Sequence, residues 1–373
     1  MRTKDLLKTP MHDYYIEKGI KLTDFGGWAL PIQYTKIQDE HKAVRDKVGI
    51  FDVSHMGEIL ISQGKEDVYS WFNQIITNDV NKVDLYDAQY TAIVNEQGMT
   101  LDDIIYYHIA PQQLLLTPNA ANKEKILDWL DKHNINGQVK IDDQSSKYGL
   151  IAIQGPFSQK VLEKLTQVNL NEIPYYSIKV DTKVGEIENI LISKTGYTGE
   201  LGFELYTPWE EIPALWQALL EAGEEFDITE CGLGSRDTLR LEAGFPLYGN
   251  ELSEDISPIE GGIAFAVDLS KDDFIGKESL VAIKDNPNRR MSRGFELVDK
   301  GIARQSYRIF ETAESDQIIG QVTSGTKSPT LNKPIGLALV EKPFAELNQT
   351  VYIEIRNKRV EAVLTKKDWL KKA

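Results

Sequence analysis

The sequence contains few of the residues that form covalent or metal cross-links. It has one cysteine, Cys231, and five histidines among 373 residues. A single cysteine excludes an internal disulfide and a cysteine-rich metal site. The histidines are scattered and lack the spacing of metal ligands. We therefore expect no metal cofactor.

Long apolar runs and an excess of positive charge are also lacking. No run is long enough to cross a bilayer, and residues 1–10 carry charges without the apolar segment of a signal peptide. The net charge is −15 at pH 7, which argues against nucleic acid or an anionic membrane as the main partner. We expect a cytoplasmic protein. The negative net charge does not exclude a small anionic ligand, because such a ligand needs only two or three well-placed cations.

The length of the chain exceeds what one hydrophobic core usually supports, so two or three domains are expected. The best linker candidate is 286–290, which reads Asn-Pro-Asn-Arg-Arg. After it come six short strand-like segments with turn signals and no helix between them, a pattern typical of a small antiparallel barrel or sandwich. These segments are 294–297, 307–310, 318–323, 336–339, 350–355 and 359–364.

Before the linker, both helical and strand patterns occur. Helices are predicted at 38–47, 66–76, 122–133, 208–222 and 277–285, with one more ending near 165. Strands are predicted at 89–94, 100–109, 114–116, 187–193 and 263–267, with one more starting at 148.

The stretch 196–205, Gly-Tyr-Thr-Gly-Glu-Leu-Gly-Phe-Glu-Leu, combines a turn with an alternating strand. We expect the leucines and Phe203 on one face and Glu204 on the other. The glycines let another backbone or a flat ligand approach closely. Taken alone, Glu204 fits a solvated position on a surface hairpin as well as a ligand contact.

Other candidate polar residues also fit two interpretations. Asp102 and Asp103 are neighbours in a strand and face opposite sides, so one is expected to meet solvent and the other a partly buried space. Spacing does not say which. Asn119 follows a strand and fits a turn or helix cap as well as an amide that orients a ligand. His55 could be catalytic or a structural hydrogen-bonding group, and Met56 could wall a ring or belong to the core.

A glycine-rich start and Gly244 at the end predict a helix within 231–244. Arg236 and Arg240 lie one turn apart on it, and Asp237 can pair with Arg240. Both arginines fit a surface ion-pair ladder, while Arg236 is the freer guanidinium for a ligand. The glycines match neither a phosphate-binding loop nor the dinucleotide fingerprint, which gives little support to a nucleotide site. Earlier in the chain, Trp28 is expected to anchor the N-terminal arm on a core.

Six motifs occur together in one order. They are Phe-Gly-Gly-Trp at 25–28, Phe-Asp-Val-Ser-His-Met at 51–56, Leu-Asp-Asp at 101–103, Gly-Tyr-Thr-Gly-Glu at 196–200, Arg-Asp-Thr-Leu-Arg-Leu-Glu-Ala-Gly at 236–244 and Thr-Ser-Gly at 323–325. In this combination the chain closely resembles the aminomethyltransferase family of the glycine cleavage system, the T protein, over nearly its whole length.

The resemblance implies an α+β fold of three domains arranged as a clover-leaf. Two are folate-binding α+β domains with antiparallel sheets: domain 1 comprises 1–50 and 145–285, and domain 2, at 51–144, is inserted into it. The third, 286–373, is an antiparallel β-barrel.

The resemblance also implies the reaction. The one-carbon unit of an aminomethyl group passes from the dihydrolipoyl arm of H protein to tetrahydrofolate, giving 5,10-methylenetetrahydrofolate and ammonia. Tetrahydrofolate is then the co-substrate, lipoylated H protein the direct partner, and the P and L proteins indirect partners. No flavin is expected, because the related sarcosine and dimethylglycine dehydrogenases carry an N-terminal flavin domain for which this chain has no room.

Carried over position by position, the resemblance makes Asp103 the catalytic acid. The expected folate-binding residues are Glu204, Arg236, Asn119, Tyr197 and Met56. A further family contact near the C-terminus is not carried over, because 366–370 reads Lys-Lys-Asp-Trp-Leu where relatives have a segment with Phe or Tyr.

The chemistry of these residue types suits the implied reaction. A carboxylate at Glu204 can accept two N–H groups from the edge of a pterin, and the fork of Arg236 suits a carbonyl or carboxylate. Asp103 would stabilise positive charge on the aminomethyl carbon and could also relay a proton; we expect charge stabilisation to dominate. The alternative is a non-enzymatic folate-binding protein of the iron–sulfur assembly type, but its Lys-Gly-Cys motif is absent and Cys231 has a different context.

Overall fold

A computed structural model of the chain describes residues 6–370. The described residues form two compact units. Unit 1 contains the described residues up to Phe72 together with Val80–Tyr90 and Ile104–Asp237. Unit 2 contains Asn73–Asp79, Thr91–Asp103 and the described residues from Thr238. The three-domain boundaries given above stay a prediction.

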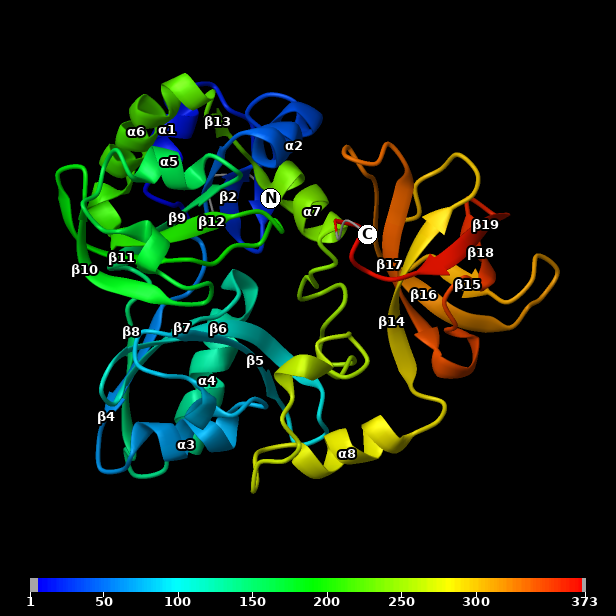
Figure 1. Cartoon of the computed structure of the whole chain (residues 1–373). Helices are drawn as coiled ribbons and strands as arrows, with labels where there is room; N and C mark the ends of the chain where they lie inside the picture. Colours follow the sequence, from blue (N-terminus) through cyan, green and yellow to red (C-terminus); the bar gives the residue numbers. More distant parts are fainter. Residues whose placement is uncertain (1–5, 371–373) are drawn as a thin grey trace. The chain divides into compact units, whose positions relative to one another are not determined.

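Unit 1 contains a six-stranded sheet in the order β10-β11-β12-β9-β3-β13. Neighbouring strands are antiparallel except β13, which runs parallel to β3. Helices α5 and α6 lie over one face of this sheet (Figure 1). The elements are β3 (Gly49–Asp52), β9 (Tyr148–Gln154), α5 (Ser158–Leu162), β10 (Ile178–Val184), β11 (Ile187–Ser193), β12 (Gly202–Pro208), α6 (Ile212–Gly223) and β13 (Thr229–Glu230).

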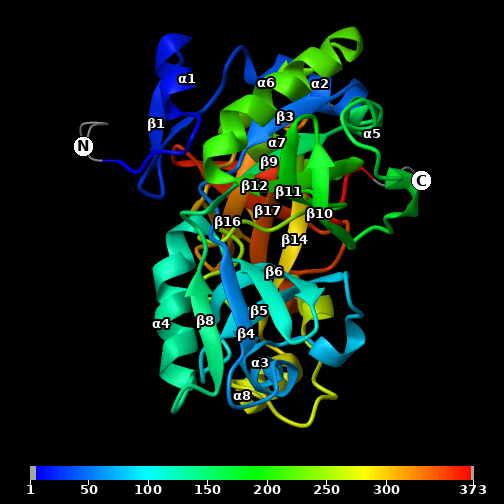
Figure 2. The same cartoon turned by 90° about the vertical axis from the view of Figure 1, so that its left-hand side faces the viewer.

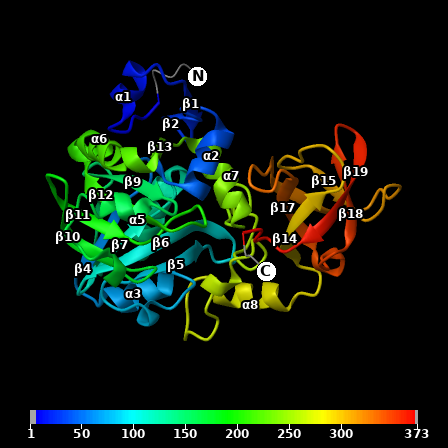
Figure 3. The ribbon, with the colours of Figure 1, turned by 45° about the horizontal axis from the view of Figure 1, so that its top comes forward.

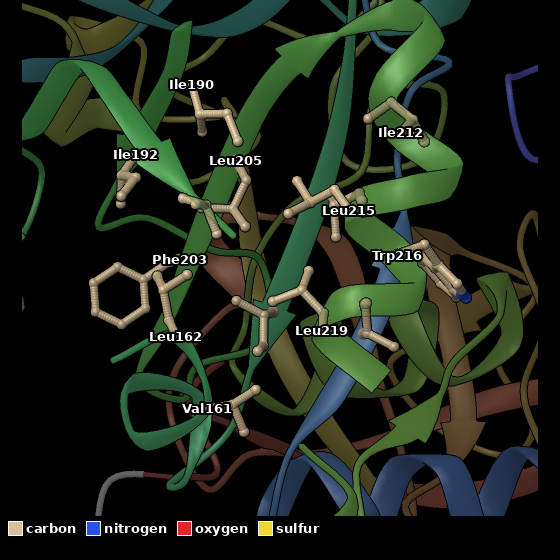
Figure 4. Close-up of a cluster of buried hydrophobic side chains, with 14 of the residues drawn as sticks. Val161, Leu162, Ile190, Ile192, Phe203, Leu205, Ile212, Leu215, Trp216 and Leu219 are labelled. Carbon is tan, nitrogen blue, oxygen red and sulfur yellow. The ribbon is translucent and has the colours of Figure 1, made fainter. Parts of the chain in front are cut away.

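The hydrophobic core of unit 1 lies between these helices and the sheet. Helix α6 presents Ile212, Leu215, Trp216 and Leu219, which recur at helical spacing and are buried. Figure 4 shows Leu215 of α6 directed toward Leu205 on the sheet, with Phe203 beside Leu162 of α5, and all four belong to one buried cluster. Burying each such side chain contributes about 1.5–3 kcal/mol to the stability of the fold.

The N-terminal segment adds a helix and a hairpin to unit 1, followed by a second helix (Figure 3). The elements are α1 (His12–Glu17), β1 (Leu22–Phe25), β2 (Trp28–Pro31) and α2 (Ile37–Asp46). Trp28 packs against the unit 1 core, which confirms its predicted role as an anchor for the N-terminal arm.

A second sheet has five strands in the order β5-β6-β7-β4-β8. Helix α4 runs alongside β8 (Figure 2). Strands β5 and β6 each contribute residues to both units. The elements are β4 (Ile59–Gln63), α3 (Val68–Ile75), β5 (Ala88–Val94), β6 (Thr100–Ala110), β7 (Gln113–Thr117), α4 (Lys123–His133) and β8 (Val139–Asp143).

Unit 2 contains a closed antiparallel barrel in the order β14-β17-β16-β15-β18-β19 (Figure 1). All six predicted strands are confirmed, and so is the helix α8 (Lys277–Asp285) before the linker. The strands are β14 (Arg290–Leu297), β15 (Arg308–Phe310), β16 (Ile318–Lys327), β17 (Pro334–Glu341), β18 (Thr350–Ile355) and β19 (Lys358–Thr365). Helix α7 (Leu233–Glu242) contributes residues to both units.

The chain also contains short 3₁₀ helices. They are η2 (Val80–Lys82), η3 (Ala120–Asn122), η4 (Leu170–Glu172), η5 (Trp209–Glu211), η6 (Glu224–Phe226), η7 (Ala264–Ala266) and η8 (Lys342–Phe344). The predicted strand at 263–267 is wrong, because η7 forms there through local hydrogen bonds such as Ala266 N to Ile263 O at 2.9 Å. Within residues 6–370, no helix combines the length and apolarity needed to cross a membrane.

Candidate active site

The glycine-rich turn before β12 wraps around Gln154, a buried residue at the end of β9. Gln154 Nε2 donates to Thr195 O at 3.2 Å, and its Oε1 accepts from Thr198 Oγ1 at 2.8 Å. A Cβ atom at Gly196 or Gly202 would lie only 2.0 or 2.2 Å from this amide. The glycines therefore make room for Gln154. The sequence indicated a close approach here but did not identify the partner.

A second contact holds the outer side of the same turn. Arg45 on α2 donates from Nη1 to Thr198 O at 2.6 Å and to Glu200 Oε1 at 3.0 Å. The turn is thus fixed from two sides by side chains that are distant in the sequence. Tyr197 lies between Thr195 and Thr198, whose contacts with Gln154 and Arg45 fix the backbone on both sides of it.

Glu204 lies in the middle of β12 and is only 7% exposed, so the interpretation as a solvated hairpin residue is wrong. Its Oε2 accepts a hydrogen bond from Thr195 Oγ1. Among the described residues, no group donates to its other oxygen, Oε1. Burial raises the pKa of Glu204, while the Thr195 hydrogen bond and the charge of Arg236 lower it. Leu201, expected on the apolar face, precedes β12 and is exposed.

Arg236 lies in the first turns of α7, with its guanidinium carbon 4.9 Å from the centroid of the Tyr197 ring. Its Nη1 atom is buried and has no hydrogen-bond partner among the described residues. A buried donor without a partner costs about 1–3 kcal/mol, and more when it is charged. The negative charge of Glu204 acts on this guanidinium. The site thus holds a donor and an acceptor that both lack protein partners.

The start of α7 is fixed by the buried carboxylate of Glu40 on α2. Its Oε2 accepts from Gly232 N at 2.9 Å and from Ser235 Oγ at 3.0 Å. A Cβ at Gly232 would lie 2.5 Å from Ile32 O, so this glycine lets the helix start pack against a neighbouring backbone. The glycine-rich start therefore positions Arg236 and does not form a phosphate loop.

The single thiol lies beside this helix start. Cys231 is buried, and its backbone N donates to Ile50 O at 2.9 Å. Burial and the nearby carboxylate of Glu40 raise its pKa well above the ordinary value. It therefore stays a protonated packing group.

Met56 and Asn119 are brought together by the backbone. Gly57 N donates to Pro118 O at 3.1 Å. This bond places Met56, which precedes Gly57, next to Asn119, which follows Pro118. Both Met56 and Asn119 are partly buried. Asn119 immediately precedes η3, as expected of a turn residue.

His55 lies in the same loop as Met56 and is only 4% exposed. Its Nδ1 has no hydrogen-bond partner among the described residues, so the interpretation as a structural hydrogen-bonding group is not supported. Its ring meets the edge of Phe25 at 5.5 Å between centroids. Burial, together with the charge of Arg236, lowers the pKa of His55 to about 3, so the ring is neutral at physiological pH.

Asp103 belongs to unit 2, whereas Glu204, Arg236, Asn119, Tyr197 and Met56 belong to unit 1. It lies in β6, where Asp102 is buried and Asp103 is partly exposed. Strand alternation puts Asp103 on the same face of β6 as Tyr107.

Arg240, the second arginine of α7, is buried in unit 2, so the surface-ladder interpretation is wrong for it. It donates from Nη1 to Glu251 Oε2 at 2.9 Å and from Nη2 to Ser324 Oγ at 2.8 Å. A Cβ at Gly325 would lie 2.1 Å from Ala303 O. Arg240 of the motif 236–244 and Gly325 of the motif 323–325 are therefore explained by packing in unit 2.

Two family models match the chain. The one described as the GCVT N-terminal domain matches residues 11–271, and the one described as the glycine cleavage T-protein C-terminal barrel domain matches residues 290–371. Among residues 6–370, no group of three or more His, Cys, Asp or Glu residues is arranged to hold a metal.

Curated relatives and a solved structure agree with these models. An aminomethyltransferase of Lysinibacillus sphaericus is 44% identical over 371 residues, covering 100% of both chains. One of Halalkalibacterium halodurans is 46% identical over 356 residues, covering 95% of this chain and 96% of the relative. The crystal structure of the glycine cleavage system aminomethyltransferase T from Bartonella henselae matches with a TM-score of 0.88 at 27% identity, covering 98% of each chain.

Proposed function

The chain belongs to the aminomethyltransferase family of the glycine cleavage system, and from this premise we propose that its unit 1 site binds the pterin of tetrahydrofolate through Glu204 and Arg236. One observation carries the proposal: the Glu204 carboxylate accepts one hydrogen bond, from Thr195, while Nη1 of Arg236, whose charge interacts with it, is buried without an acceptor among the described residues. A ligand that offers both donors and acceptors would satisfy both groups.

The pterin edge has this pattern. Its amino-pyrimidine N–H groups suit the Glu204 carboxylate, and its carbonyl suits the Arg236 fork, and such charge-assisted hydrogen bonds are stronger than neutral ones. Tyr197 would form one wall of the site, because its ring already stacks on the guanidinium. Met56 and Asn119, which the backbone holds together, would line it further.

We propose Asp103 as the catalytic carboxylate. Tetrahydrofolate supplies the nitrogens that accept the one-carbon unit. The chain's own part is to hold the ring in place, which is worth several kcal/mol in near-attack geometry, and to stabilise the positive charge that develops on the aminomethyl carbon. A carboxylate in the position of Asp103, partly exposed on β6, can supply the second effect.

The direct partner in this proposal is lipoylated H protein, which carries the aminomethyl group, and the P and L proteins are indirect partners. The relatives' shared name supports this assignment. The net charge of −15 argues against nucleic acid or an anionic membrane as a partner, and the cytoplasmic location stays a prediction.

The test is ammonia release from aminomethyl-loaded H protein, with and without tetrahydrofolate. We expect release that depends on tetrahydrofolate, and an increase in its KM of about 10–100-fold in Glu204→Gln, because a charge-assisted hydrogen bond is worth about 1.5–3 kcal/mol. Tetrahydrofolate binding without ammonia release would instead support the non-enzymatic alternative, and unchanged KM in Glu204→Gln would contradict the site.

A second variant isolates the catalytic acid. Asp103→Asn keeps the size and removes the charge, so we expect kcat to fall about 100-fold or more while the Kd for tetrahydrofolate stays within about threefold. Near-normal turnover in this variant would remove Asp103 from the mechanism.

A further inference from the structure

A chain of buried hydroxyl groups leads to the Glu204 carboxylate. We call it the hydroxyl chain; it consists of Thr117, Tyr206, Tyr107, Ser193 and Thr195. Thr117 Oγ1 lies 2.9 Å from Tyr206 Oη, which donates to Tyr107 Oη at 3.0 Å. The Tyr107 hydroxyl lies near those of Ser193 and Thr195, and these two oxygens lie 2.8 Å apart. Thr195 then donates to Glu204 Oε2.

These groups have few choices of direction. Each hydroxyl carries one proton, and the proton of Thr195 goes to the carboxylate, so the 2.8 Å contact with Ser193 requires Ser193 to donate to Thr195. The proton of Tyr206 goes to Tyr107, so Thr117 donates to Tyr206. The donors thus point along the chain toward Glu204. Hydrogen bonds aligned in this way polarise one another in a low-dielectric interior.

The hydroxyl chain comes from four different strands or their ends, and all five of its members are at most 7% exposed. Apolar side chains of the same shape would pack equally well, whereas one buried hydroxyl left without a hydrogen-bond partner would lower the stability of the fold. The one anion at which the chain terminates is the group that we assign to the pterin.

We propose that Thr195 is a positioning residue for Glu204: with the hydroxyl chain behind it, Thr195 turns one carboxylate oxygen inward, so that the other is presented to the ligand. This proposal rests on the proposed function of Glu204 as a folate contact. It adds residues that the sequence motifs did not single out.

Other ionisable groups near Glu204 do not titrate near neutral pH. They are Arg236, Tyr107, Tyr175, Tyr176 and Tyr206. Burial raises the pKa of each tyrosine, and a guanidinium stays charged. Burial also raises the pKa of Glu204, and the Thr195 hydrogen bond offsets part of that rise. Without Thr195, Glu204 is the group whose protonation moves toward neutral pH.

The experiment measures the Kd for tetrahydrofolate by anaerobic calorimetry between pH 6 and pH 9. In Thr195→Val we expect a Kd about 10–100-fold higher near pH 6, recovering toward the wild-type value as pH rises and Glu204 ionises. Thr195→Ser restores the donor and should stay within about threefold of wild type. Tyr107→Phe, one step further away, should change Kd in the same direction by a smaller factor.

The matched control is Thr182→Val. Thr182 is buried in the same sheet, and its hydroxyl donates to Ile190 O at 2.7 Å, outside the hydroxyl chain. This variant should lose thermal stability without changing Kd at any pH. If Thr195→Val does not fold, the pH profile of Tyr107→Phe still decides.

Two negative results are distinguishable. If Glu204→Gln weakens binding but Thr195→Val and Tyr107→Phe bind as wild type at every pH, the positioning role is overturned and the folate site stands. If Glu204→Gln itself binds as wild type, the proposed function of Glu204 fails, and the inference fails with it.

Discussion

The two faces of β12 are stabilised by different physics although their residues alternate in one short strand. Phe203 and Leu205 face α5 and α6 and make many weak apolar contacts. Glu204 and Tyr206 face the other way, where among the described residues the Glu204 side chain makes one directional hydrogen bond and that of Tyr206 makes two. Apolar packing tolerates substitutions that conserve volume, whereas a buried polar network fails when a single partner is removed.

This difference separates stability from specificity within one strand. We expect the apolar face to govern the free energy of unfolding and the polar face to govern ligand affinity. The four predictions below begin with the apolar face of β12 and continue with buried polar groups, in order of decreasing free-energy change.

The largest effect is expected on the apolar face. Phe203→Ala removes a buried ring and leaves a cavity, so the free energy of unfolding should fall by about 3–5 kcal/mol in urea titrations. Phe203→Leu conserves most of the volume and should cost less than about 2 kcal/mol. Equal losses in the two variants would show that this face depends on shape as strictly as the polar face.

The next effect tests the space around Gln154. Gly202→Ala displaces the buried Gln154 amide and breaks its hydrogen bonds to Thr195 O and Thr198 Oγ1, so we expect a loss of about 2–3 kcal/mol in thermal unfolding. Gly301→Ala is the control, because its new methyl group meets other atoms only at 3.5 Å or more. Adding Gln154→Ala to Gly202→Ala should cost less than the sum of the single variants; strict additivity would contradict the steric explanation.

The third prediction concerns a buried polar group without a protein partner. The pKa of His55 is about 3 in the folded chain, against about 6.5 when unfolded, so the unfolded state binds more protons between these values. The contribution of His55 to the free energy of unfolding is fully present above pH 6.5 and decreases as pH falls. The decrease is about 2 kcal/mol at pH 5. In His55→Gln this part of the pH dependence should disappear from unfolding curves, and a slope that is unchanged would contradict the assignment.

The smallest effect compares two buried carboxylates. Glu58 is buried like Glu204, but neither of its oxygens has a hydrogen-bond partner among the described residues. Burial raises the pKa of Glu58 well above its usual value, so its contribution to stability is most favourable below about pH 4 and declines as pH rises. Glu58→Met should therefore stabilise the fold by about 1–2 kcal/mol at pH 7.5 and by nearly nothing at pH 4. An equal gain at both pH values would exclude ionisation as the cause.

Much of the fold could be predicted because it depends on local periodicity. The six barrel strands, helix α8 and strand β11 follow directly from apolar alternation or helical spacing. The segment 263–267 is apolar enough for a strand, yet it has no strand partner and closes into η7, with Phe265 76% exposed. Composition does not reveal whether a partner strand exists.

The candidate site was only partly predictable, for the same reason. Strand alternation predicts that Glu204 and Phe203 lie on opposite faces of β12, but it does not predict that both faces are buried. Gln154, Tyr107 and Thr117 come from segments far from Glu204 in sequence. Ser193, Thr195 and Tyr206 are near it, but a buried threonine or serine has no sequence signature that distinguishes it from any other. The surface ion-pair ladder predicted for Arg240 is wrong because its partner, Glu251, lies outside helix α7.

The burial of Cys231 also makes the chain a practical subject for spectroscopy. Since the one native thiol is protonated and enclosed, a maleimide dye should leave it unmodified. A cysteine introduced at an exposed position such as Phe265 would then carry a single fluorophore, with no need to delete a native residue first.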